Sequence, residues 1–154
     1  MAYLIDTSII VRGSEPKSPL HGVAVSAVAN LRAENAPLHL ARQNLIEYRN
    51  VATRPIDKNG LGMTVAKADA RLTVLEHDFD VLPDTDAIYF VWRELIAAKA
   101  VSGKQVHDAR LVAVMLTYGI THILTFNDQD FVRYQSLPVS LGQGIGVVHP
   151  QTIS

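Results

Sequence analysis

The sequence predicts a three-layer α/β/α domain, in which a mostly parallel sheet is flanked by helices. Strand-like and helix-like segments alternate along the chain, which is the pattern of crossover units and therefore of parallel strands. The 154 residues include 48% hydrophobic and 19% charged residues, a globular composition. Because no repeat or linker divides the sequence, we expect a single domain spanning residues 1–154.

The first half of the chain is expected to contain a strand, a helix, a strand and a helix, in this order: residues 2–5, 19–35, 38–40 and 41–53. The two strands are short apolar runs, and apolar side chains recur at helical spacing in the first helix. The second helix should stop before Pro55, because proline cannot continue a helix and disfavours helical backbone in the residue before it.

The second half begins with the turn-rich connector IDKNGLGM and continues the alternation. The expected helices are residues 64–77, 86–99 and 103–118, and the expected strands are 81–82, 123–125 and, within GIGVVHP, 144–150. Helix 86–99 has the clearest amphipathic pattern. Pro83 ends strand 81–82, which precedes this helix.

Asp108 is in phase with the apolar face of its predicted helix. Positions +3, +4, +7 and +8 from it are Leu111, Val112, Met115 and Leu116. An unpaired charge beside a core is costly, so the carboxylate either caps the helix or projects into a site that needs negative charge. Ser102 and Gln105 match a capping box, which would start the helix at Ser102 and place Asp108 in its second turn, beyond the cap.

Other polar groups follow the predicted strands. Asp6 ends the first strand, and Asn127, Asp128 and Asp130 follow the strand at 123–125. Ligands of open parallel sheets bind beyond these carboxyl ends, although each such residue taken singly is more often a turn residue.

Glu47 lies inside helix 41–53, in phase with Asn44, and by itself it is an ordinary helical glutamate. Carboxylates that converge on one cleft suit divalent metal ions, two of which can clamp a phosphodiester. Glycoside hydrolysis by an acid–base pair stays open on spacing alone.

The segments around these residues resemble the PIN domain, a metal-dependent ribonuclease fold that includes VapC-type toxins of bacterial toxin–antitoxin pairs. Four segments carry the resemblance in the family's order: LIDTS around Asp6, NLIEYRNVATRP around Glu47, HDARLVAVM around Asp108, and ILTFNDQDF over residues 123–131. Together they extend over essentially the whole chain.

The resemblance implies that Asp6, Glu47 and Asp108 are catalytic and hold Mg²⁺ or Mn²⁺, with Asn127 and Asp130 as further metal ligands. Many family members have Asp where this chain has Asn127, which implies a weaker second metal site. The implied reaction is endonucleolytic hydrolysis of RNA phosphodiester bonds, leaving a 5′-phosphate. We expect phosphate contacts from two arginines near the acidic residues, Arg49 and Arg110.

The implied partners are an RNA substrate, a small cognate antitoxin and a second copy of the chain. We expect a cytoplasmic location, since no apolar run is long enough to cross a bilayer and there are no cysteines. The net charge of −1 gives no global sign of nucleic-acid binding.

The alternative is a PIN-fold module that binds RNA or protein and cleaves poorly or not at all, which Asn127 favours. A phosphatase that needs a second Asp two residues after the first is disfavoured, because that position is Ser8.

Overall fold

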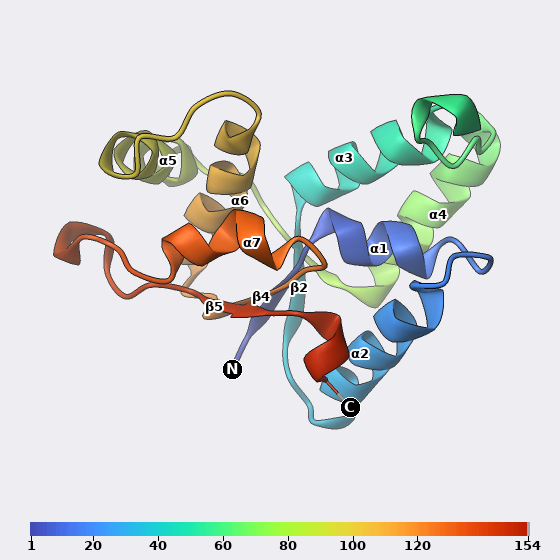
Figure 1. Cartoon of the computed structure of the whole chain (residues 1–154), viewed down its shortest axis with the longest axis horizontal. Coiled ribbons are helices and arrows are strands. Elements are labelled where there is room, and N and C mark those ends of the chain that lie inside the picture. The colour runs from blue at the N-terminus through green and yellow to red at the C-terminus, as the bar shows by residue number, and fades with distance from the viewer. Residues whose placement is uncertain (154) are drawn as a thin grey trace.

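A parallel sheet of five strands forms the middle layer of the computed structural model, which describes residues 1–153 (Figure 1). The strands are β1 (Tyr3–Ile5), β2 (Leu38–Ala41), β3 (Asp80–Leu82), β4 (His122–Leu124) and β5 (Gly146–Val148). Their order across the sheet is β3-β2-β1-β4-β5, and every neighbouring pair is parallel. The predicted three-layer α/β/α architecture is confirmed.

Seven α-helices connect and cover these strands within residues 1–153. They are α1 (Thr7–Gly13), α2 (His21–Ala33), α3 (Arg42–Thr53), α4 (Val65–Asp78), α5 (Asp86–Ala98), α6 (Gln105–Tyr118) and α7 (Asp128–Phe131). Short 3-10 turns are η1 (Ile56–Lys58), η2 (Val132–Tyr134), η3 (Val139–Leu141) and η4 (Pro150–Thr152). In the part of the chain that the structure describes, none of the helices is long and apolar enough to cross a membrane.

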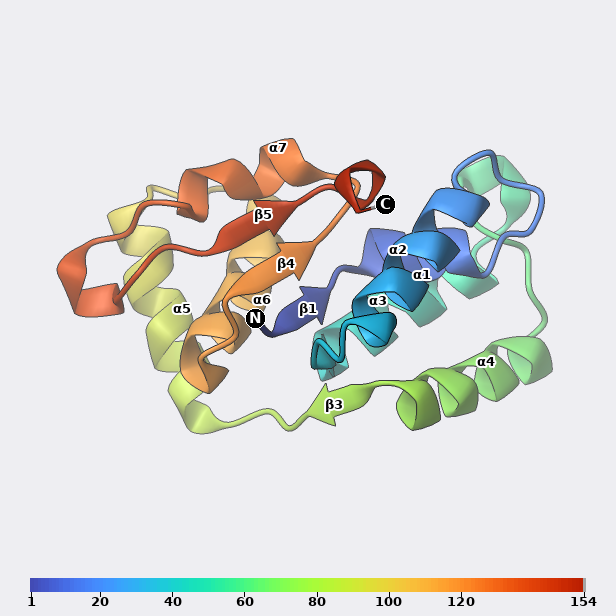
Figure 2. The same ribbon diagram turned by 90° about the horizontal axis from the view of Figure 1, so that it is seen from below.

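The sheet separates two apolar cores, because successive side chains of a strand point to opposite faces. Leu4 and Ile123 pack on one face in a cluster that contains the buried residues of α5 and α6. Ile5 and Leu124 face the other cluster, to which α1, α2, α3 and α4 contribute. Figure 2 shows α5 and α6 on one side of the sheet and α1, α2 and α4 on the other.

The strand order reverses at β1, and this reversal positions the site. The chain adds β2 and β3 on one side of β1 and then crosses to place β4 on the other side. Ile5 is in register with Leu124, and the Asp6 N–H donates to the Leu124 carbonyl (3.0 Å). Open α/β sheets bind ligands at such a switch point, beyond the carboxyl ends of the strands.

Local features differ from the sequence expectations, among them the short α7, which was not predicted, and two that need explanation. The first is α1, which the sequence did not predict, because TSIIVRG is short and rich in β-branched residues that favour strands. Burial of Ile9, Ile10 and Val11 against the sheet overrides that propensity.

The second difference is the start of α6, which begins at Gln105 and not at Ser102. Gly103 has a φ of +62°, a left-handed conformation that a right-handed helix cannot include. The capping box is therefore wrong, and Asp108 lies in the first turn instead of the second. Lys104 is the N-cap residue, and no hydrogen bond within residues 1–153 uses the Asp108 side chain as a cap.

Candidate active site

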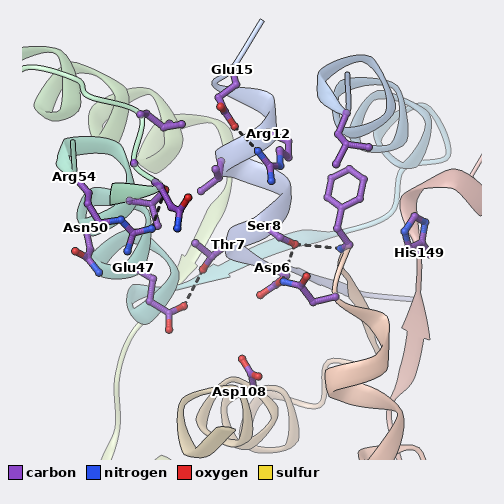
Figure 3. Close-up of a pocket in the computed structure, with 18 of the residues that line it drawn as sticks. Asp6, Thr7, Ser8, Arg12, Glu15, Glu47, Asn50, Arg54, Asp108 and His149 are labelled. Atoms are coloured by element: carbon purple, nitrogen blue, oxygen red, sulfur yellow. Dashed lines mark hydrogen bonds and ion pairs between the residues drawn. The ribbon is translucent and has the colours of Figure 1, made fainter. Parts of the chain in front are cut away.

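A cleft of about 920 Å³ opens beyond the carboxyl ends of β1 and β4. Asp6 at the end of β1, Glu47 of α3 and Asp108 of α6 line it. Figure 3 shows their carboxyl groups facing one shared space from three different elements. Asn127 also lines the cleft. Asp130 is exposed on α7, and its negative charge acts on Asp108.

Asp6 is buried and held by two hydroxyl groups. Its Oδ2 accepts hydrogen bonds from Ser8 Oγ (2.8 Å) and Thr125 Oγ1 (2.7 Å). Burial raises the pKa of the Asp6 carboxyl, and the hydrogen bonds from Thr125 and Ser8 partly oppose this. Thr125 Oγ1 also accepts from the Asn127 N–H (2.9 Å), so one hydroxyl links the ends of both strands.

Glu47 is oriented by hydrogen bonds at both carboxylate oxygens. Thr7 Oγ1 donates to Oε1 (2.9 Å), and Gln43 Nε2 donates to Oε2 (3.2 Å). Thr7 in turn accepts from the buried Asn44 Nδ2 (3.1 Å). The carboxylate of Glu47 is therefore fixed relative to the start of α1 as well as to its own helix.

Gln43 connects α3 to α6 across the cleft. Its Nε2 also donates to the His107 carbonyl (2.8 Å), directly before Asp108, and its Oε1 accepts from Arg110 Nη1 (3.0 Å). The side chain thus couples the helix that carries Glu47 to the first turn that carries Asp108. Gln43, Asn44 and Thr125 were not predicted as site residues. Their signal in the sequence was weak: Gln43 and Asn44 lie one turn before Glu47, and Thr125 ends a predicted strand.

Replacing Asn44 should destabilise the fold beneath the site. Asn44 is 0% exposed, and its Oδ1 accepts from the Ala41 N–H (2.8 Å). Asn44→Ala leaves that N–H without its partner, so we expect a loss of about 2 kcal/mol in the free energy of unfolding. Urea denaturation measures this loss. Asn50→Ala, an exposed position on the same helix, should change stability little, and equal effects of the two substitutions would contradict the role given to Asn44.

The Asp108 carboxyl is half-buried, and three neighbouring carboxyl groups act on it electrostatically. Its pKa rises to about 7, first because of burial and then because of the charges of Asp6, Asp130 and Glu47; Lys104 lowers it. No hydrogen bond to its side chain is present among residues 1–153. The protein therefore holds a half-buried acid next to other acids without a compensating donor from the described chain.

The donor set fits a hard divalent cation. Carboxylates, an amide oxygen and hydroxyls face the cleft, and these oxygen ligands suit Mg²⁺ or Mn²⁺. Burial and repulsion from neighbouring carboxylates raise the pKa of Asp108, and a cation would relieve the repulsion. Within residues 1–153, no three His, Cys, Asp or Glu side chains approach closely enough to enclose an ion by themselves. Mg²⁺ suits such a loose arrangement, since it keeps several waters and needs only one or two carboxylates.

The two arginines predicted to contact phosphate lie outside the cleft lining. Arg49 pairs with Asp69 on α4, and Arg110 contacts Gln43 and Asp84 (3.2 Å). Each is two residues from an acidic site residue, and residues two apart in a helix face different directions. The arginines that do line the cleft are Arg12 and Arg54, which the sequence analysis did not favour.

Comparison with known proteins agrees with this geometry. The sequence model of the PIN domain matches residues 3–137. Among curated proteins, none matches the chain. Solved structures with a similar fold include the three described next.

A chain of VapBC2 from Rickettsia felis, bound to a DNA fragment from its promoter, is 14% identical, with a TM-score of 0.66, covering 97% of this chain and 98% of that one. VapBC-1 from nontypeable Haemophilus influenzae is 14% identical, with a TM-score of 0.65 and coverage of 98% and 99%. VapC20 from Mycobacterium tuberculosis, a toxin that cleaves the sarcin-ricin loop, is 21% identical, with a TM-score of 0.58 and coverage of 79% and 87%.

Proposed function

The chain belongs to the PIN-domain family, and from this premise we propose that it is a divalent-metal-dependent endoribonuclease that hydrolyses RNA phosphodiester bonds. The observation that carries the proposal is the meeting of Asp6, Glu47 and Asp108, from three separate elements, at the switch point of the sheet. A structural role alone does not account for placing Asp108 among like charges that raise its pKa.

In this proposal Asp6, Glu47 and Asp108 would hold a hydrated cation, Asn127 would assist at the edge of the cleft, and Asp130 would act through its charge on Asp108. When bound, Mg²⁺ or Mn²⁺ supplies Lewis-acid chemistry, which activates water and neutralises charge that develops on phosphate. Ser8 and Thr125 keep the Asp6 carboxylate in place, and Thr7 and Gln43 do the same for Glu47. The expected products carry a 5′-phosphate and a 3′-hydroxyl.

The proposal extends to the toxin component of a type II toxin–antitoxin pair, with a small antitoxin as partner. The similarity in fold to chains of VapBC complexes supports it. A homodimer also belongs to the proposal, and the exposed Tyr89 and Phe90 on α5 are its candidate contacts. To test the partner, the chain is co-expressed with the product of a short reading frame beside its gene. We expect the two proteins to co-purify and the growth of the host cells to be restored.

An RNA cleavage assay tests the activity. The purified chain is incubated with a pool of structured RNAs in Mg²⁺, in Mn²⁺ or in EDTA, and the new ends are mapped. We expect cleavage in either metal, none in EDTA, and 5′-phosphate ends. RNA binding without cleavage in any metal would contradict the proposal and favour a non-catalytic PIN-fold module, consistent with Asn127 in place of an acid.

A further inference from the structure

The cleft extends beyond the acidic residues, between α1 and α3. Glu47 and Asn50 of α3 line it together with Arg54, which directly follows that helix, and Ser8 and Arg12 of α1 line it together with Glu15, which lies just beyond that helix. Each wall of the cleft therefore carries an arginine, and Figure 3 shows Arg12 on the α1 side and Arg54 on the α3 side, both away from Asp108. This end of the lining carries two arginines beside one carboxylate, Glu15, although the net charge of the whole chain is −1.

We propose that Arg12 and Arg54 form a phosphate-binding subsite for the single-stranded RNA that flanks the bond to be cleaved. The inference rests on the proposed function and adds to it a residue pair that recognises the substrate backbone. Guanidinium groups bind phosphate through two parallel hydrogen bonds, which makes arginine suited to this task.

Arg54 is held in place while most of its donors stay free. A guanidinium has five N–H donors, and Nη2 donates to the Asn59 carbonyl (3.0 Å). The loop that follows packs against Arg54: Gly62 N–H donates to its carbonyl (2.9 Å), and a Cβ on Gly60 would lie 1.9 Å from the same oxygen. The Nε atom is buried without a hydrogen-bond partner in residues 1–153. Arg54 is therefore preorganised, which lowers the entropy lost when it binds an anion.

Arg12 is held less firmly than Arg54, and its ion pair with Glu15 leaves donors available for a phosphate. Arg12 Nη1 pairs with Glu15 (2.8 Å), one helical turn away, and both side chains are partly exposed. Exposed pairs of this kind contribute little to stability. The two non-bridging oxygens of a phosphate can therefore accept hydrogen bonds from the remaining donors of Arg12. This binding would cost little folding stability.

The spacing assigns the subsite to a flanking phosphate and not to the reacting one. Glu47 lies in α3 and Arg54 directly follows its last residue, Thr53, so about 9 Å of helix separates them along the axis. We therefore assign Arg54 to a phosphate next to the one at the acidic end. The cleft volume of about 920 Å³ lies near the upper limit for small-molecule pockets, so there is room for more than the scissile group.

Binding of a labelled RNA to full-length variants tests the subsite. The probe is a random-sequence single-stranded RNA with a fluorescent 5′ label, and every variant also carries Asp108→Asn so that the probe stays intact. Fluorescence anisotropy gives the Kd at increasing NaCl. We expect Arg12→Gln and Arg54→Gln each to weaken binding roughly tenfold, and to lower the salt slope by about 0.7. Arg49→Gln removes the same charge from α3 outside the cleft and should change neither quantity.

Equal losses in all three variants would overturn the inference, because they would show a diffuse charge effect. Unaltered binding in Arg12→Gln and Arg54→Gln, or no RNA binding by the parent chain, would also overturn it. The cleavage assay with metal ions is read separately, so the proposed activity can stand when the subsite fails. If thermal melting shows that Arg54→Gln is unfolded, the test of the subsite rests on Arg12→Gln, because that substitution leaves the loop after α3 intact.

Discussion

Asp108→Asn is expected to make the metal-free protein more stable near neutral pH while it removes the proposed activity. The ordinary pKa of an aspartate is 3.8, and in the folded chain that of Asp108 rises to about 7 because of burial and nearby carboxylates. Ionised Asp108 therefore opposes folding, and a neutral side chain of the same shape removes this cost. We expect a gain of about 2 kcal/mol in the free energy of unfolding at about pH 8, after allowing for the partial exposure of the group.

The gain in the free energy of unfolding caused by Asp108→Asn should increase with pH. Below about pH 4 the carboxyl is protonated in both the folded and the unfolded chain, and the substitution changes little. Between about pH 4 and pH 7 the folded state binds more protons than the unfolded state, so the stability of the unsubstituted chain falls as pH rises. The difference from Asp108→Asn should grow through this window and level off above it. Urea denaturation in EDTA across this range measures it.

Asp86→Asn is the matched control for this measurement. Asp86 is exposed and also lies in the first turn of a helix, α5, where a negative charge is favourable. Its replacement should lower stability by roughly 0.5 kcal/mol at neutral pH. If Asp108→Asn were equally destabilising, Asp108 would be serving the helix end and the account of a strained acidic cleft would be wrong. Added Mn²⁺ should stabilise the unsubstituted chain and reduce the advantage of Asp108→Asn.

Asp6→Asn is expected to cause the largest loss of activity among substitutions that keep the fold. The amide oxygen can still accept the hydrogen bonds from Ser8 and Thr125, so the local structure should persist. The negative charge at the centre of the cleft is lost, and we expect cleavage to slow by about 10³-fold. Initial rates on RNA in Mn²⁺ measure this effect, and circular dichroism confirms the fold.

Asp130→Asn provides the comparison for Asp6→Asn. Asp130 is exposed on α7 and does not line the cleft, although its charge acts on Asp108. We expect a loss of about tenfold, the size usual for groups that act through a metal-binding residue. A loss as large as that of Asp6→Asn would place Asp130 directly in the site.

The parallel sheet and the position of Asp108 could be predicted from the sequence, because the apolar residues there recur with a clear period. The alternation of apolar runs and amphipathic segments indicated the parallel sheet, and the phase of Asp108 with Leu111 and Val112 indicated a carboxylate at the edge of a core. Both features depend only on periodicity along the chain. The α1 helix was missed because its β-branched residues favour a strand, and only packing against the sheet makes it helical.

The supporting residues of the site were not predictable from the sequence alone. Gln43 contacts the carbonyl of His107, and Thr125 contacts Asp6, through contacts that span 64 and 119 residues. Only the folded chain brings such pairs together. Arg49 and Arg110 were selected for their nearness in sequence to Glu47 and Asp108, whereas Arg12 reaches the cleft from α1 and Arg54 from the turn that ends α3.

Calorimetric titration with Mn²⁺ at about pH 8, where Asp108 is ionised, is the most direct test of the central claim that these carboxylates form a cation site. The unsubstituted chain and Asp108→Asn are titrated side by side, without RNA. We expect saturable binding by the unsubstituted chain and a loss of at least about tenfold in affinity for the variant. Absence of binding by the unsubstituted chain, or equal binding by both proteins, would contradict it.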